Sequence, residues 1–243
     1  SISFIVVAIS VILHFHSTNA IIVVDGKIVP AWPEEVQNSA LTKGSASSTT
    51  STPFGFFPRP RDTTYGIVMI VDFSDQPAKF TKEQVNDWLN KKGYSSTYAN
   101  GSVNDYFNQI SNGKFNLIND VFGYYRAKNP KSYYENTNSY DKALELVNEM
   151  VTYFDPTVDF SKYDNDKNGT TESISFVYAG AGKTFGQGLW PHAGRVGKKL
   201  DGVNLGSYNM SEMGSGLSLY VFCHETGHMV FGWPDLYWFG DYC

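Results

Sequence analysis

Three residues near the end of the chain, His224, Glu225 and His228, have the types and spacing of a zinc site with a general base. On an α-helix, residues four apart differ by only about 40° around the axis, so both histidines can point at one metal ion. Zinc binds imidazole nitrogen and prefers four ligands. A glutamate beside such histidines is placed to activate a water molecule, as in metallopeptidases. The alternative is a chance match in a buried helix.

The residues around this pattern favour the metal-site interpretation. The segment before it is apolar and predicts a core helix: Leu217, Leu219, Val221 and Phe222. Gly232 is expected to end this helix, as glycine often does just past a C-terminus, and Pro234 prevents its continuation. Asp235 then offers an acidic oxygen where the returning chain can approach the metal. We therefore predict zinc bound by the two histidines and Asp235, with Glu225 as the catalytic base.

Residues 164–172, with the sequence DNDKNGTTE, form a second candidate metal motif. Oxygen-bearing side chains recur at alternate positions, which suits the oxygen cage that calcium requires: Asp164, Asp166, Asn168, Thr170 and Glu172. An EF-hand would need glutamate at the twelfth position, but Ser175 stands there, within a predicted strand. We therefore predict an isolated calcium loop, with an ordinary surface turn as the alternative.

The elements that must position these motifs alternate between helix and strand. A continuous apolar, β-branched run over residues 66–73 predicts a buried central strand. Other strands are expected over residues 115–122 and 173–178, and an edge strand over 203–210. Helices are expected over residues 81–92, with a capping box at Thr81 and Gln84, over 102–112, capped by Ser102, and over 140–154. This order predicts an α/β (α+β) fold with a mixed, twisted sheet.

The N-terminal part of the chain is typical of an exported protein. Residues 1–15 are nearly all apolar, yet fewer than the ~20 needed to span a bilayer. We predict a signal peptide over residues 1–20 and a secreted product, with a membrane anchor or a core strand as alternatives. Residues 21–62, with a Ser/Thr-rich run, are either a pro-segment or a disordered leader. Residues 63–243 are the predicted catalytic domain, which we expect to be truncated at its C-terminus.

These motifs together resemble the immune inhibitor A family of secreted metallopeptidases. The resemblance rests on the pattern H-E-x-G-H…G-x-P-D-L-Y over residues 224–237 and on residues 71–75, 105–107, 111–114 and 159–164. It implies a zincin-like fold, proteolytic activity, a catalytic zinc and a structural calcium. The family's helix usually reads HExxHxxGxxD, whereas this chain has one residue more before Gly232. The extra residue shifts Asp235 by one position, and Asp241 is the alternative third ligand.

The expected function is that of a secreted zinc endopeptidase, which cleaves protein or peptide substrates through a zinc-bound water activated by Glu225. The alternative is a secreted, calcium-stabilised binding module, or an inactive fragment, that keeps a peptidase fold. The net charge of −5 gives no electrostatic case for nucleic acid. No membrane span is expected after signal cleavage, and the oligomeric state is left open. His192 either faces the cleft or is structural, and Glu212 is not predicted to be a ligand.

Two cysteines and three sequons complete the expectations. After export, Cys223 and Cys243 would meet an oxidising compartment, and we predict that they pair. A buried thiol, or a partner outside this sequence, is the alternative. The sequons mark Asn100, Asn168 and Asn209 as candidate glycosylation sites.

Overall fold

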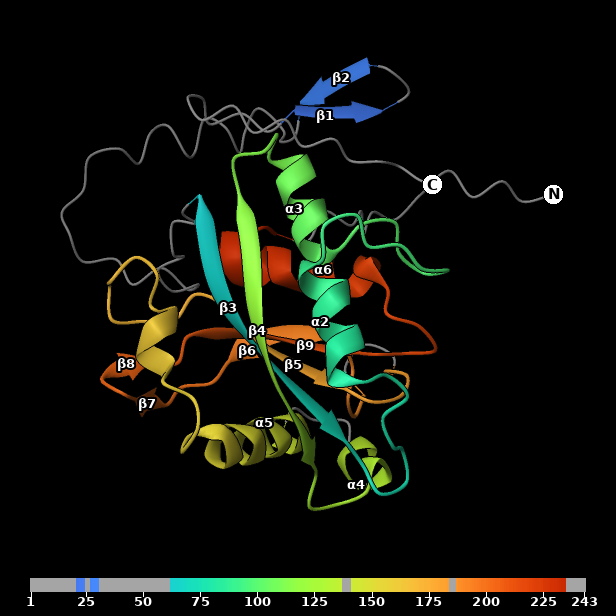
Figure 1. Ribbon diagram of the computed structural model, residues 1–243, viewed down its shortest axis with the longest axis vertical. Helices are drawn as coiled ribbons and strands as arrows, with labels where there is room; N and C mark the ends of the chain where they lie inside the picture. The colour runs from blue at the N-terminus through green and yellow to red at the C-terminus, as the bar shows by residue number, and fades with distance from the viewer. Residues whose placement is uncertain (1–20, 25–26, 31–61, 137–140, 184–186, 235–243) are drawn as a thin grey trace, which may run out of the picture.

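A computed structural model of the chain describes residues 21–24, 27–30, 62–136, 141–183 and 187–234 (Figure 1). Its main sheet has five strands in the order β4-β3-β5-β9-β6. The bounds are Thr63–Asp72 for β3, Asn116–Arg126 for β4, Ile174–Tyr178 for β5, His192–Arg195 for β6 and Ser207–Glu212 for β9. The pairs β3–β4, β3–β5 and β5–β9 are parallel, and β6 pairs antiparallel with β9. The fold is therefore α/β with a mostly parallel sheet.

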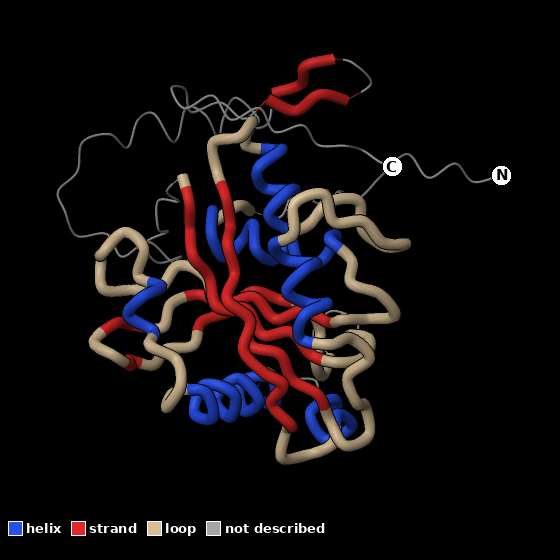
Figure 2. The backbone as a smooth tube through the Cα atoms, viewed as in Figure 1, coloured by secondary structure: helices blue, strands red, loops and turns tan. Residues whose placement is uncertain are grey.

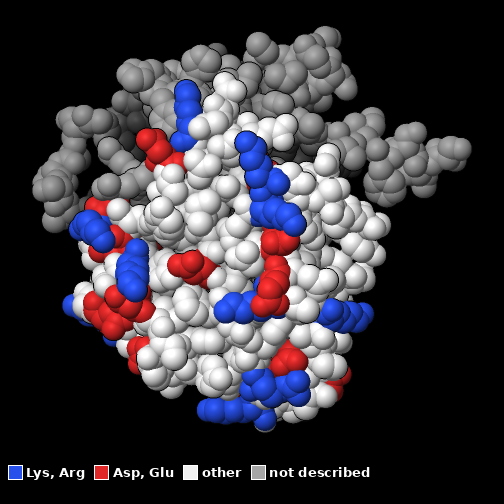
Figure 3. All heavy atoms as spheres, viewed as in Figure 1, with Lys and Arg blue, Asp and Glu red and all other residues white. Residues whose placement is uncertain are grey.

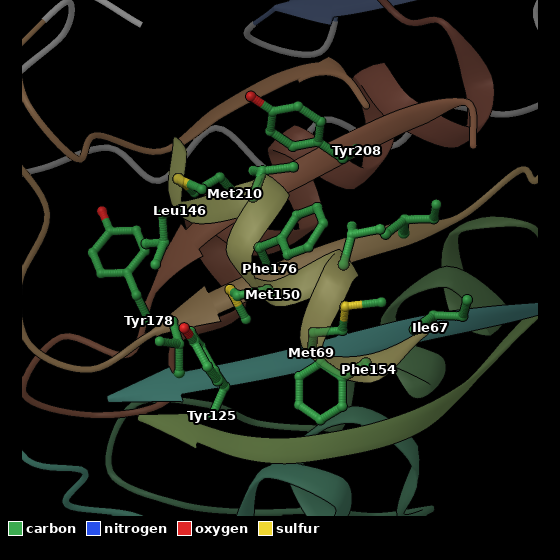
Figure 4. Close-up of a cluster of buried hydrophobic side chains, with 14 of the residues drawn as sticks. Ile67, Met69, Tyr125, Leu146, Met150, Phe154, Phe176, Tyr178, Tyr208 and Met210 are labelled. Carbon is green, nitrogen blue, oxygen red and sulfur yellow. The ribbon is translucent and has the colours of Figure 1, made fainter. Parts of the chain in front are cut away.

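Helices cover both faces of this sheet (Figure 2). Helix α5, Asp141–Phe154, lies on one face of the sheet. Its apolar stripe packs against the buried side chains that β3 and β5 direct toward this face. On the other face lie α2, Lys82–Asn90, α3, Val103–Ile110, and α6, Leu219–Thr226. Figure 4 shows the first core, where Met69 and Phe176 from the sheet face Met150 and Phe154 from α5.

The predicted central strand and helix caps are confirmed. Strand β3 has hydrogen-bonded neighbours on both sides, and its run from Ile67 to Val71 is fully buried. Thr81 accepts a hydrogen bond from the Gln84 backbone N–H, and the Gln84 side chain accepts from the Thr81 N–H. Ser102 caps α3 in the same way with Asp105. These local signals fix where the helices begin, as expected for capping boxes.

The expectation of one edge strand over residues 203–210 is wrong. The segment divides into a short strand β8, Val203–Asn204, which pairs with β7, Lys199–Leu200, and strand β9. Strand β9 lies inside the sheet, because β6 pairs with its outer side and becomes the edge among the described strands. The burial of Tyr208 and Met210 on β9 reflects this interior position.

The remaining described elements are short. Strands β1, Ile21–Val24, and β2, Lys27–Pro30, form an antiparallel pair, and α4, Lys131–Glu135, and a 3-10 turn, Phe160–Tyr163, flank α5 in the chain. None of the helices in the described ranges has the length and apolarity to cross a membrane. On the face in Figure 3, acidic and basic side chains are interspersed. Residues 1–20, the predicted signal peptide, and residues 31–61 lie outside the described residues.

Candidate metal centre

The helix that carries the histidines packs on the same face of the sheet as α2 and α3. Ser218 caps α6, with its hydroxyl accepting from the Tyr220 backbone N–H at 3.3 Å. Phe222 and Cys223 pack into the second core, the cluster of buried side chains between the sheet and the helices α2, α3 and α6. Beyond Thr226 the helix continues as a π-helical turn over Gly227–Phe231. This turn ends at Gly232, whose φ of 64° is left-handed. The predicted glycine stop is therefore confirmed, while the π-turn is a feature that the sequence did not predict.

The two histidines converge, as their spacing predicts. Their Nε2 atoms lie 3.1 Å apart, and their ring centroids are 4.6 Å apart. Two imidazole lone pairs do not approach this closely unless a proton or a cation lies between them. Two nitrogens bound to one tetrahedral zinc at ~2.0–2.1 Å would be about 3.3 Å apart, so this donor pair fits zinc.

A hydrogen bond at Nδ1, the nitrogen that does not face His224, orients the ring of His228. His228 Nδ1 lies 2.5 Å from the Trp233 carbonyl oxygen. Because a carbonyl only accepts, Nδ1 donates this hydrogen bond, and the bond turns the Nε2 edge of the ring toward His224. Metal-binding histidines are commonly fixed in this way by a carbonyl or carboxylate.

Glu225 has the burial and position of a general base beside this site. The residue is only 8 % exposed, and its Oε1 lies 4.0 Å from His224 Nε2. The carboxylate is therefore close to the histidine nitrogens. A water molecule held between them would be within reach of a base.

Gly227 and Trp233 form a contact that sequence reasoning missed. A Cβ on Gly227 would lie 2.6 Å from Trp233 Cε3, closer than any real Cβ contact. The Trp233 ring stacks on Phe231 with centroids 4.6 Å apart and 14° between planes. The chain after Gly232 thus folds back over Gly227, and this return brings the Trp233 carbonyl to His228. No local sequence pattern predicts that the chain after Gly232 folds back onto Gly227.

The candidate third ligands, Asp235 and Asp241, lie outside the described residues, and so does Cys243. Cys223 is a buried thiol in the second core, and burial raises its pKa. Its pairing with Cys243 stays a prediction. Glu212 lies at the end of β9, outside the cluster of candidate metal-binding side chains that the described residues form.

His192 has structural surroundings. Its Nδ1 donates to the Trp190 carbonyl at 2.7 Å, and its Nε2 accepts from the Tyr208 hydroxyl at 2.9 Å. The residue is only 5 % exposed, and burial lowers its pKa. Of the two interpretations from the sequence, the structural one fits this environment.

The acidic loop brings three of its five predicted calcium ligands together. Carboxylate oxygens of Asp164, Asp166 and Glu172 lie within 4.8 Å of one another. Asp164 and Glu172 are buried, and none of the three forms an ion pair with a lysine or arginine of the described chain. Burial raises the pKa of Glu172. Buried like charges are costly without a counter-charge, so a cation fits this loop.

The other two predicted ligands are arranged differently. The Asn168 side-chain amide donates to Asp166 Oδ2 at 3.0 Å, and Thr170 pairs with Asn204 in an isolated bridge. Backbone N–H groups of Asn168 and Gly169 donate to the two Asp164 oxygens, each at 3.0 Å. Gly169 has a φ of 84°, as the tight turn requires.

The sequons differ in accessibility. Asn100 and Asn168 are exposed, whereas Asn209 is fully buried. The Asn209 amide donates to the Phe222 carbonyl and to the Thr226 hydroxyl. A glycan on Asn209 would require the core to open, which argues against that site.

Comparisons with known proteins give no match to this chain, either among family models or among curated protein sequences.

Proposed function

We propose that this chain is a zinc-dependent endopeptidase. The observation that carries the proposal is the 3.1 Å approach of the His224 and His228 Nε2 atoms beside the carboxylate of Glu225. The resemblance of the motifs to the immune inhibitor A family supports the same conclusion. So does the hydrogen bond from His228 Nδ1 to the Trp233 carbonyl, because metal-binding histidines are commonly oriented by such a bond from the other ring nitrogen.

The chain's own residues would divide the chemistry between them. The two histidines would hold the ion, with Asp235 as the proposed third protein ligand and Asp241 as the alternative. When bound, zinc supplies a Lewis acid that polarises a carbonyl and lowers the pKa of water to about 7. Glu225 would take the proton from the attacking water and pass it to the leaving amine. Its partial burial strengthens this role, because charges interact more strongly away from solvent.

Hydrolysis of an unstructured protein by the full-length product tests the proposal. Wild type should cleave it, a chelator should stop cleavage, and added zinc should restore it. Glu225→Ala should be inactive, whereas Asp155→Ala, at an exposed acid outside the site, should be fully active. A zinc-loaded wild type that cleaves nothing would support the non-catalytic binding module instead.

We also propose structural calcium at Asp164, Asp166 and Glu172, with Asn168 and Thr170 as further candidates, and secretion after removal of residues 1–20. The convergence of three carboxylates, two of them buried, supports the calcium proposal. The apolar N-terminal run supports export.

A further inference from the structure

A buried hydrogen-bond network joins the sheet to the histidine helix. Its centre is Asn209, in the middle of β9 and fully buried. The Asn209 Nδ2 donates to the Phe222 carbonyl at 3.1 Å and to Thr226 Oγ1 at 3.0 Å. Its Oδ1 accepts from the Ser211 hydroxyl at 2.6 Å. Thr226 and Ser211 are also buried, so this network is shielded from water.

The network holds α6 on the side away from the metal site. Phe222 and Thr226 are four residues apart and share one face of the helix. His224 lies two residues from each, about 200° around the axis, so it points the opposite way. Asn209 therefore contacts the back of the helix and leaves the histidine face unobstructed.

Directional bonds at this point fix more than an apolar contact would. Hydrophobic contact has no preferred direction and permits a helix to slide or rotate on a sheet. Two hydrogen bonds from one amide, to a backbone carbonyl and a hydroxyl one turn apart, fix both rotation and translation. Ser211 fixes the amide in turn, because its donation to Oδ1 turns Nδ2 toward the helix.

The hydrogen bond from Asn209 to Thr226 lies where the helix changes from α-helical to π-helical. Thr226 is the last residue of α6, and the π-turn with His228 starts at Gly227. His224 precedes this junction and His228 follows it, so the separation of their nitrogens depends on where the junction falls. We propose that Asn209, oriented by Ser211, is a positioning residue that fixes this junction through Thr226 and thereby sets the His224–His228 geometry for metal binding. The inference rests on the proposed zinc site.

Two substitutions of Thr226 separate positioning from packing. Thr226→Val keeps the volume but removes the oxygen that accepts from Asn209, whereas Thr226→Ser keeps the oxygen and removes a buried methyl group. Zinc affinity of the full chain, measured by chelator competition, should fall roughly tenfold or more in Thr226→Val, as for other residues that support metal ligands. It should stay near the wild-type value in Thr226→Ser, even though that variant melts earlier. The absorption spectrum of the cobalt-substituted chain should change only in Thr226→Val.

A second pair avoids altering the helix. Ser211→Ala should weaken zinc binding, whereas Ser175→Ala should not: Ser175 is equally buried and is the register partner of Asn209 on β5, but the described hydrogen bonds of the Asn209 amide go to Phe222, Thr226 and Ser211. If Thr226→Val and Ser211→Ala both bind zinc with wild-type affinity and keep the wild-type cobalt spectrum, this inference is wrong while the proposed function stands. A wild-type chain that binds no zinc would overturn the proposed function as well.

Discussion

His224 Nε2 and His228 Nε2 lie 3.1 Å apart although the two residues belong to different helical types. His224 is in the α-helical part of the segment and His228 is in the π-turn. A π-turn accommodates one residue more than an α-turn, and such turns recur at functional sites. The extra residue that separates this chain from the pattern HExxHxxGxxD is therefore absorbed within the helix before Gly232. The structure offers a physical reason why the insertion and a converging histidine pair coexist.

Gly227→Ala is expected to weaken zinc binding roughly tenfold, because the new methyl group displaces Trp233 and with it the carbonyl that orients His228. Helix propensity alone would predict the opposite for stability, a gain of about 1 kcal/mol. Chelator competition and thermal melting together check the prediction. Adding Trp233→Leu should relieve the clash and recover part of the affinity. A more stable single variant with wild-type zinc affinity would show that the contact has no role in the site.

Asp164→Ala should reduce the rise in melting temperature that calcium produces. The substitution removes a buried carboxylate whose oxygens organise the loop through the Asn168 and Gly169 amides. Asp155→Ala, at an exposed acid outside the loop, is the matched control and should respond to calcium as wild type does. The loop is an ordinary turn if calcium chelation leaves the wild-type melting temperature unchanged.

The protective effect of calcium should also depend on pH through Glu172. Burial raises the folded-state pKa of this carboxyl above the ordinary value of 4.5. Without calcium, its contribution to stability is therefore present below about pH 4.5 and lost as the pH rises through the folded pKa. Calcium binds the ionised form, so the calcium-dependent rise in melting temperature should grow over the same window.

Glu172→Gln isolates this effect, since it removes the titration and keeps the shape. Melting with and without calcium, from about pH 4.5 to about pH 7, measures it. Equal calcium shifts at both ends of this range in wild type would contradict the assignment.

Cys223 should resist alkylation in the native chain, because the thiol is buried and its pKa is raised. If it pairs with Cys243, it should resist alkylation after denaturation too, until a reductant is added. Mass mapping of the denatured, unreduced product distinguishes the two states. A labelled Cys223 at that stage would rule out the disulfide.

The sequence predicted those parts of the fold whose signals are local. The run of residues 66–73 has apolar side chains on both faces, which only an interior strand needs, and β3 is such a strand. Thr81 and Ser102 cap helices through bonds to residues three positions away. The two histidines converge because residues four positions apart lie on the same face of a helix.

Features that depend on distant segments were not predictable in this way. The interior place of β9 depends on β6, a short strand whose residues 192–195 carry no strand pattern. Asn209 looks like a surface sequon, and only the packing of α6 on β9 shows it to be a buried link. The Gly227–Trp233 contact depends on a chain reversal at Gly232, and the π-turn depends on how the helix packs.

Zinc binding by three forms of the full chain, measured by equilibrium dialysis, tests the central claim most directly. Wild type and Glu225→Ala should each bind one zinc ion, because Glu225 activates water and is not a ligand. His228→Ala should bind zinc at least roughly tenfold more weakly, because it loses one of the two converging nitrogens. Wild-type zinc affinity in His228→Ala, or no zinc in the wild-type chain, would contradict the account.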